Sequence, residues 1–348
     1  MSLARICAAP NERAAIPTAS FELCDSSSVK PTVVIVSPAN AKANNGNWHT
    51  AARWARFLSH DYAVKVVERW STGAALPDVL LTLHARRSSP SLLDYRAARA
   101  KGGVLLALTG TDVYRDIHED ELSKQSLKLA DRMIVLQPAA LAELSSAHRA
   151  KTDVVYQSAA FLKPAPRYQR WFDVVQVGHL RHEKDPFTPI TALRLLPDES
   201  QIRLTHIGNA LDQHHTDTMT IVTRDEPRLR WLGGIDHAAT RQRIKRAHAL
   251  VIASKMEGGA NVIVEAVTSG VPVIASHISG NRGMLGDDYP GYFELGDATA
   301  CAKLMRRIET DTAFYKRLCR AAAKRAQLFA PHREAAAIRA AVARVLAA

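Results

Sequence analysis

The 348-residue sequence predicts an α/β protein with two Rossmann-like domains that face each other across a cleft. Short apolar runs of strand length alternate with helical patterns, as in a doubly wound sheet. This alternation occurs twice, on either side of the proline-containing stretch 163–166. The length also suits two domains of roughly 150 to 170 residues. Because parallel strands end at one edge of a sheet, we expect ligands in the cleft between the two sets of strand ends.

The expected strands are short runs rich in Val, Ile and Leu. They cover residues 32–36, 63–67, 79–83, 104–108, 132–136 and 153–156, and then 173–177, 203–207, 229–232, 250–253 and 273–275. Helices are expected at residues 48–59, 92–100 and 121–130, and from about residue 298 to the end, with a break at Pro331. The expected segments are a disordered leader (1–30), a first domain (31–166), a second domain (167–325) and a C-terminal helix (326–348) that packs back on the first domain.

The composition favours an anionic partner. The chain has 46 Lys and Arg against 34 Asp and Glu, a formal net charge of +12. We expect no nucleic acid partner, because the basic residues are spread along helices rather than gathered in an arm or an aromatic-interleaved stripe. No apolar run approaches the ~18 residues that span a bilayer, so no membrane insertion is expected. The 4 cysteines have neither disulfide density nor metal-ligand spacing, which predicts a cytoplasmic protein.

The stretch 250–276 combines a strand, a Glu-Gly-Gly loop, and a short helix that starts near residue 261. Backbone amides in the loop would point into the cleft, where they and the helix dipole suit a diphosphate. These amides belong to Gly258, Gly259, Ala260 and Asn261. Glu257 and Glu265 bracket them, and a carboxylate beside a diphosphate suits sugar hydroxyls, from which it accepts hydrogen bonds. If the pair is considered in isolation, the alternative is that neither glutamate binds a ligand: Glu257 would be a solvated loop residue and Glu265 a helix-surface residue.

The same stretch resembles the Glu-x7-Glu signature of the retaining glycosyltransferases of family 4, and its Glu-Ala-x-x-x-Gly-x-Pro-Val-Ile-Ala-Ser continuation also matches. The resemblance implies a GT-B fold and retention of anomeric configuration. It places Glu257 at the donor sugar and Glu265 at the ribose of the nucleotide. The resemblance extends over essentially residues 31–348, and the segment 279–283 resembles a loop of small residues after a strand.

A second element, residues 178–184, resembles the Gly-Arg-x-x-x-x-Lys segment of the family, whose basic residues clamp the diphosphate. Lys184 matches the lysine of that segment. His179 stands at the arginine position, and Arg181 is expected to supply the missing charge. The resemblance thus makes Glu257, Lys184 and Arg181 the catalytic residues, with amides and cations stabilising the leaving group in place of a metal ion.

Three short segments at expected strand ends of the first domain resemble those of the selenosugar synthases of selenoneine biosynthesis. Their candidate substrate-binding residues are Gly46 and Asn47 in the loop 44–47, His84, Arg86 and Arg87 after the strand 79–83, and Thr109, Gly110 and Thr111 after the strand 104–108. The resemblance implies transfer from a UDP-sugar, UDP-N-acetylglucosamine or UDP-glucose, to selenophosphate. A selenium anion is already a strong nucleophile and needs positive charge and amides rather than a general base. No cofactor and no metal are expected.

Several alternatives remain open at this point. A GT-B glycosyltransferase with an ordinary hydroxyl acceptor and a UDP-sugar 2-epimerase share the expected architecture. A sugar-nucleotide or polyanion binding protein without catalysis would also carry the positive charge. The pattern at His84 fits a core or helix-capping histidine as well as a ligand contact. Arg86 and Arg87 fit plain solvent-facing residues as well as an anion site.

Overall fold

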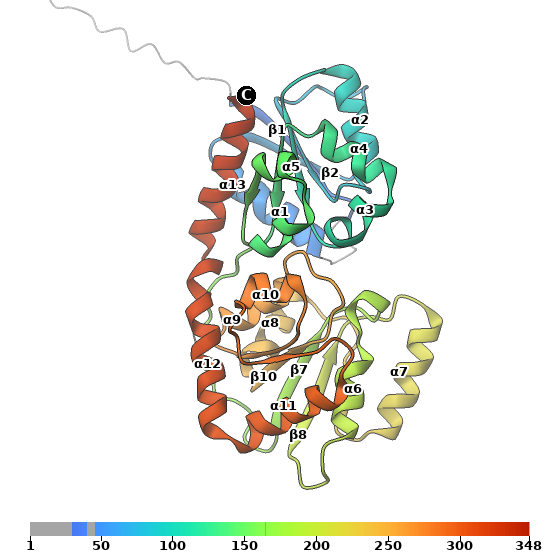
Figure 1. Ribbon diagram of the computed structural model, residues 1–348, viewed down its shortest axis with the longest axis vertical. Helices are drawn as coiled ribbons and strands as arrows, with labels where there is room; N and C mark the ends of the chain where they lie inside the picture. The colour runs from blue at the N-terminus through green and yellow to red at the C-terminus, as the bar shows by residue number, and fades with distance from the viewer. Residues whose placement is uncertain (1–29, 40–45, 164, 348) are drawn as a thin grey trace, which may run out of the picture. The chain divides into compact units, whose positions relative to one another are not determined.

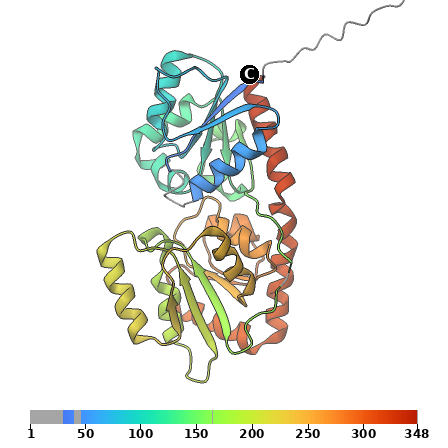
Figure 2. The same ribbon diagram turned by 180° about the vertical axis from the view of Figure 1, so that it is seen from behind.

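The computed structural model describes residues 30–39, 46–163 and 165–347, and in these the chain forms two six-stranded parallel sheets (Figures 1 and 2). The strand order of the first sheet is β2-β1-β3-β4-β5-β6 and that of the second is β12-β11-β10-β7-β8-β9. In each sheet the chain starts at an inner strand, builds one side out to the edge and then crosses to the other side. Each sheet therefore has a switch point, between β1 and β3 in the first and between β7 and β10 in the second, where a doubly wound sheet binds ligands.

The first half of the chain carries most of the expected strands within one or two residues. Its strands are β1 (Thr32–Val36), β2 (Ala63–Val67), β3 (Val79–Leu83), β4 (Val104–Leu108), β5 (Arg132–Val135) and β6 (Thr152–Val154). Its helical segments are α1 (Gly46–Leu58), α2 (Ser89–Ala98), η2 (Asp112–Asp116), α3 (Ile117–Glu119), α4 (Glu121–Leu129), η3 (Pro138–Glu143) and α5 (Ser146–Ala150). All residues of β3 and β4 are buried, because apolar side chains cover both faces of the sheet.

The second half repeats this plan. Its strands are β7 (Phe172–Val177), β8 (Ile202–Ile207), β9 (Leu229–Trp231), β10 (Ala249–Ile252), β11 (Val273–Ser276) and β12 (Tyr292–Phe293). Its helical segments are η4 (His182–Lys184), α6 (Phe187–Arg194), α7 (Gln213–Asp225), α8 (His237–Arg246), α9 (Asn261–Val267), α10 (Ser279–Leu285) and α11 (Ala298–Thr310). One hydrophobic core joins this sheet to its helices.

The end of the chain contributes to both halves. The helix α12 (Thr312–Ala326) packs on α9 and α10, and after η5 (Gln327–Phe329) the helix α13 (Pro331–Leu346) lies against α1 and the first sheet (Figure 1). Glu334 at the start of α13 is buried and accepts hydrogen bonds from Trp54 Nε1 at 2.7 Å, Arg53 Nε at 2.7 Å and the Ser158 amide at 2.7 Å. The first core thus includes residues from the far end of the chain.

Two local expectations are wrong. The segment 279–283 is the beginning of the helix α10 rather than a loop, because the small residues Gly280 and Gly283 allow close packing against Glu257 and Gln137. Gly46 and Asn47 belong to the first turn of α1, whereas Asn44 and Asn45 lie outside the described residues, as does the leader up to residue 29.

None of the helices in the described ranges has the length and apolarity that a membrane crossing requires.

Candidate functional site

The switch point of the second sheet brings Lys184 and Glu257 together. Lys184 follows β7 in the segment η4, and Glu257 follows β10, the strand beside β7. Lys184 Nζ lies 2.5 Å from Glu257 Oε1, and the Ser254 hydroxyl donates to the same oxygen at 2.6 Å. Glu257 is only 7% exposed. A buried carboxylate with two donors on one oxygen is held in a single orientation, which leaves its other oxygen for a ligand.

Arg181 lies three residues before Lys184, whose backbone amide donates to the Arg181 carbonyl at 3.0 Å. The buried Nε of Arg181 has no hydrogen-bond partner, and its guanidinium forms no ion pair with any residue the structure describes. Burial alone would raise the pKa of Glu183, but a hydrogen bond to its own backbone and the charges of Arg181 and Arg115 lower it. The site therefore contains one cation fixed to a carboxylate and one planar cation available for an anion.

His179, which stands where the family resemblance places an arginine, is occupied with the backbone. Its Nδ1 accepts a hydrogen bond from the Asn209 amide at 3.2 Å. This contact joins the turn after β7 to the turn after β8. The ring keeps two strand ends together, which a longer arginine side chain would not do in the same way.

A small cavity of about 10 Å³ lies between the ends of β7 and β10, with Lys184, Ser254 and His206 in its wall. Burial lowers the pKa of His206 to about 4. Its Nδ1 contacts Gln176 Oε1 at 3.1 Å, and its buried Nε2 has no partner in the described structure. The imidazole is therefore neutral at physiological pH and does not add charge to the site.

The loop after Glu257 faces the first half of the chain. A Cβ on Gly258 would collide with the Thr109 carbonyl, and one on Gly259 would come within 2.7 Å of Leu136 Cβ. The two glycines therefore allow the backbones of the two halves to approach each other, in addition to the phosphate approach expected from the sequence. Gly258, Gly259, Ala260 and Asn261 donate no backbone hydrogen bond within the described parts of the chain, so their amides remain available.

Glu265 on α9 has a partner that the sequence reasoning missed. It is 7% exposed, and its Oε1 lies 2.6 Å from Nε2 of His237 in the first turn of α8. The His237 ring packs against the ring of His49 on α1, with centroids 4.7 Å apart. Burial and the neighbouring His237 lower the pKa of His49, against the attraction of Glu265. This cluster connects the two halves at the end of α9.

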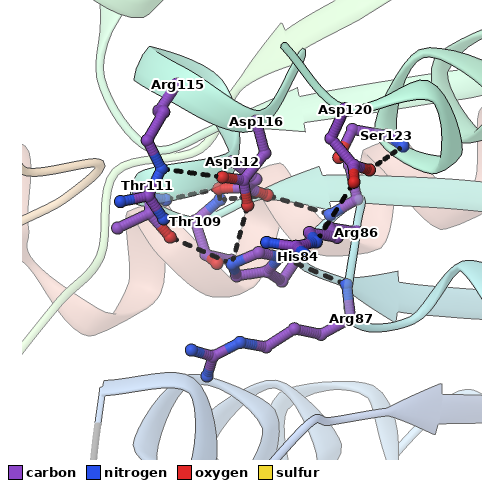
Figure 3. Close-up of polar contacts among 12 residues, drawn as sticks. His84, Arg86, Arg87, Thr109, Thr111, Asp112, Arg115, Asp116, Asp120 and Ser123 are labelled. Carbon is purple, nitrogen blue, oxygen red and sulfur yellow. Dashed lines mark hydrogen bonds and ion pairs between the residues drawn. The ribbon is translucent and has the colours of Figure 1, made fainter.

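In the first half, the residues that follow β3 and β4 form the network drawn in Figure 3. His84 has a positive φ of 74°, which is strained for a residue other than glycine. Its Nε2 lies 3.1 Å from Thr111 Oγ1 and 3.9 Å from Asp116 Oδ2, and its Nδ1 faces the Arg87 amide at 3.4 Å. Both ring nitrogens have partners inside the protein, so His84 ties the ends of β3 and β4 together.

The amides expected to hold an anion here have another use. Asp112 accepts hydrogen bonds from the amides of Thr109 at 2.9 Å and Gly110 at 2.7 Å, and also from Ala85 at 3.0 Å. In this structure the amides of Thr109 and Gly110 are thus bound by Asp112 rather than open to a ligand. The completely buried Asp112 completes the turn itself.

The two arginines after β3 differ. Arg86 forms an ion pair with Asp120 at 3.2 Å, so its charge is already compensated. The Arg87 guanidinium has no hydrogen bond or ion pair with a described residue, and its side chain lies apart from the network in Figure 3. Arg87 is thus the cation of this segment that can bind an anion.

The two halves also touch through side chains. Arg115 binds Asp116 at 3.0 Å and reaches Glu183 of the second half at 3.7 Å, and the Tyr114 hydroxyl lies 3.4 Å from Ser279 Oγ. A Cβ built on Gly46 would lie 3.4 Å from the side-chain nitrogen Nδ2 of Asn261. In the described residues, no group of three or more His, Cys, Asp or Glu side chains is arranged to hold a metal ion.

Sequence signals existed for some of the missed residues. Asp112 lies four residues after the last residue of a strand, where the following amides need acceptors, and an aspartate commonly completes such a turn. His237 follows Asp236, whose carboxylate caps α8 by accepting from the Ala239 amide at 2.9 Å. Arg115 and Glu183 carried no signal, because nothing in the sequence relates two such distant positions.

Comparison with known proteins agrees with this geometry. Residues 162–325 match the family described as glycosyl transferases group 1. Three solved structures share the fold over nearly the whole chain. They are HepE of Anabaena in complex with UDP (16% identity, 92% of this chain and 100% of that chain, TM-score 0.70), a sucrose-phosphate synthase from Thermosynechococcus elongatus (17%, 91% and 99%, 0.72), and the lipopolysaccharide outer core galactosyltransferase WaaB (15%, 90% and 99%, 0.64). No curated protein matches the chain by sequence.

The chain therefore has the GT-B glycosyltransferase fold, which confirms the expected fold class. Its segment 162–325 is similar in sequence to the glycosyl transferases group 1 family.

Proposed function

We propose that the protein is a retaining glycosyltransferase, of the family 4 type, that uses a UDP-sugar. The observation that carries the proposal is the arrangement at the switch point of the second sheet, where Lys184 lies 2.5 Å from a buried Glu257. Arg181, three residues before Lys184, has a buried Nε without a partner in the described structure. The match of residues 162–325 to glycosyl transferases group 1 supports the same assignment. The structural neighbour HepE, which binds UDP and UDP-glucose, supports a uridine nucleotide as the donor.

In this proposal each group has a defined task. The bond between the anomeric carbon and the β-phosphate oxygen breaks, and its electron pair leaves with UDP. Arg181, Lys184 and the free amides of residues 258–261 stabilise the negative charge that develops on the leaving diphosphate. Glu257, oriented by Ser254 and Lys184, accepts hydrogen bonds from the sugar hydroxyls. Glu265 accepts hydrogen bonds from the ribose.

For the acceptor we propose a small anion, selenophosphate, whose selenium forms the new bond to the anomeric carbon as UDP leaves. Water then hydrolyses the Se–P bond of this product, which releases phosphate and gives a selenosugar. The resemblance of the first-half segments to the selenosugar synthases supports this choice, as does the net charge of +12. In the structure the supporting group is Arg87, because its guanidinium has no partner among the described residues. The cytoplasm remains the expected location.

A hydroxyl acceptor is the second candidate, and one observation favours it. Three carboxylates surround the expected anion site. Asp112 takes the turn amides, Asp116 faces His84, and Asp120 neutralises Arg86. Carboxylates repel a dianion but accept hydrogen bonds from sugar hydroxyls.

The test is a product analysis by mass spectrometry. The purified protein is incubated with UDP-N-acetylglucosamine or UDP-glucose, with and without selenophosphate, and in parallel with a mixture of simple sugars as hydroxyl acceptors. We expect UDP and a selenium-containing sugar, and neither with Glu257→Gln. A glycoside formed without selenium would favour the second candidate, and no UDP release with any acceptor would contradict the glycosyltransferase assignment. Activity that persists in EDTA is expected, since cations and amides take the place of a metal ion.

A further inference from the structure

The contact between His237 and Glu265 has no counterpart in the function described so far. Glu265 Oε1 and His237 Nε2 are 2.6 Å apart, which is a strong hydrogen bond to a carboxylate. Among the described residues, His237 is the one side chain that binds the Glu265 carboxylate directly. The second oxygen, Oε2, accepts no hydrogen bond from a described residue. It does not belong to the fully buried polar atoms that lack a partner, so it is accessible. One edge of the carboxylate is held by the protein and the other is open.

The position of His237 is itself well defined. It is the first residue of α8, and the Asp236 carboxylate fixes this turn by accepting from the Ala239 amide at 2.9 Å. The His237 ring packs at 4.7 Å against the His49 ring of α1, so it is supported from the first half as well. The side chain is nevertheless about half exposed, at 49%. A ring fixed at its backbone and along one face, but open on the other side, can orient a neighbour without filling the ligand space.

Two arginines add positive potential around the pair. Arg241 on α8 interacts electrostatically with Glu265, and Arg53 on α1 interacts with His49. The Arg241 guanidinium is itself bound to the Ala160 carbonyl at 2.8 Å, so it adds positive potential without occupying the carboxylate. Glu265 therefore accepts from His237 on one oxygen and keeps full acceptor capacity on the other.

We propose that His237 is the positioning residue that orients Glu265 for the ribose hydroxyls of the nucleotide. The proposal rests on the proposed function, because it assumes that Glu265 binds the ribose of a uridine nucleotide. His237 donates the Nε2 proton to Oε1, which locks the carboxylate rotamer and turns Oε2 toward the ligand. Without this donor, the nucleotide has to immobilise a mobile glutamate side chain when it binds, and this entropy cost lowers the affinity.

The experiment separates the proton of His237 from its ring. His237→Phe keeps a ring that can pack on His49 but has no donor, whereas His237→Gln keeps an N–H donor and loses the ring. Calorimetry measures the affinity of wild type and both variants for UDP and for 2′,3′-dideoxyuridine diphosphate, which lacks the ribose hydroxyls. The matched control is His118→Phe, because His118 is also about half exposed (47%) and lies 3.1 Å from a glutamate, Glu143, but in the first half.

We expect wild type to prefer UDP over the dideoxy compound by about tenfold or more, as for hydrogen bonds to a charged group. In His237→Phe this preference should fall to about threefold or less, because the hydroxyls then meet a disordered carboxylate. The preference should return in His237→Gln and be unchanged in His118→Phe. Thermal unfolding verifies that each variant is folded.

Two results would overturn the inference. If His237→Phe keeps the wild-type preference, or binds UDP more tightly than wild type, His237 is a bystander or a competitor for Glu265. If His237→Phe does not fold, the same comparison with His237→Gln decides, because a preference lost there despite the retained donor contradicts the proposal. Failure of wild type to bind UDP at all would instead contradict the proposed function.

Discussion

The two halves of the molecule have closely similar sheets, yet their expected functional residues behave differently. In the second half, Lys184 and Glu257 come from loops 73 residues apart and meet at 2.5 Å. In the first half, Arg86 is paired with Asp120, and the amides of Thr109 and Gly110 are bound by Asp112. The second site keeps the amides of residues 258–261 and the Arg181 Nε without partners among the described residues, whereas the polar groups of the first mostly satisfy one another. A strand-end location is therefore a weak indication by itself and a strong one when a spaced motif accompanies it.

The halves differ also in what supports them. The second core is formed by residues between Val174 and Phe329, whereas the first core also needs Ile338, Val342 and Val345 from α13. Glu334 is the polar part of this attachment, since donors from three residues of the first half converge on its carboxylate. The first half thus depends on the last helix of the chain.

The largest effect is expected from breaking this attachment. Glu334→Ala leaves Arg53, Trp54 and Ser158 without their acceptor in a buried site, and it should lower the free energy of unfolding by about 3 to 5 kcal/mol. Urea unfolding followed by tryptophan fluorescence measures the change. The control is Glu294→Ala, an exposed glutamate that pairs with His277, with a change within about 0.5 kcal/mol. A loss below about 1 kcal/mol for Glu334→Ala would show that apolar contacts alone hold α13.

The next test concerns the ligand site of the second half. Lys184→Ala should lower kcat with a UDP-sugar by about 10²-fold or more, because it removes a preorganised charge at the leaving diphosphate. Lys255→Ala is the matched control, since Lys255 is in the same loop region and contacts His182 at 2.9 Å instead of Glu257. Steady-state release of UDP gives both values. Equal activity of the two variants would remove Lys184 from the mechanism.

The acid dependence of the unfolding free energy tests the burial of His206 in the second half. An unfolded histidine titrates near pH 6.5, whereas burial lowers the pKa of His206 to about 4, so the unfolded chain binds the extra proton between these values. The stabilisation is complete above about pH 6.5 and is lost toward pH 4, by up to about 3 kcal/mol. Asp173, whose pKa burial raises to about 6, opposes this trend. Unfolding of wild type and His206→Gln at several pH values should show a flatter acid dependence for the variant. If the unfolding free energies of wild type and His206→Gln change in parallel with pH, the lowered pKa of His206 is not the cause of the acid dependence.

The smallest effect tests the first half. Arg87→Ala should raise the apparent KM for an anionic acceptor by about tenfold, since its free guanidinium supplies a charged hydrogen bond. Arg86→Ala should change it by about twofold or less, because Asp120 already compensates Arg86 and exposed ion pairs contribute little. The KM at saturating UDP-sugar is measured for both. An equal effect of the two variants would place the acceptor elsewhere.

The sequence by itself determined the two sheets, because runs such as Thr32–Val36 and Val104–Leu108 bury both faces of a strand and this information is local. It also determined Glu257, Gly258 and Lys184 as candidates, because their spacing is part of a motif. It did not reveal α6, which is short and contains Pro189, or α7, in which Met219 is the one buried residue and the apolar period is weak.

Only the tertiary structure decided which polar groups pair. Asp112 rather than a ligand takes the amides after β4, His237 holds Glu265, and Glu334 ties α13 to the first sheet. The strand order was also decided only by the tertiary structure, since the sequence of one strand does not specify which strand pairs with it. The physical reason is that burial follows from the periodic pattern of a short segment, whereas a hydrogen bond between distant residues depends on where several packed elements place two side chains, to within a few tenths of an ångström.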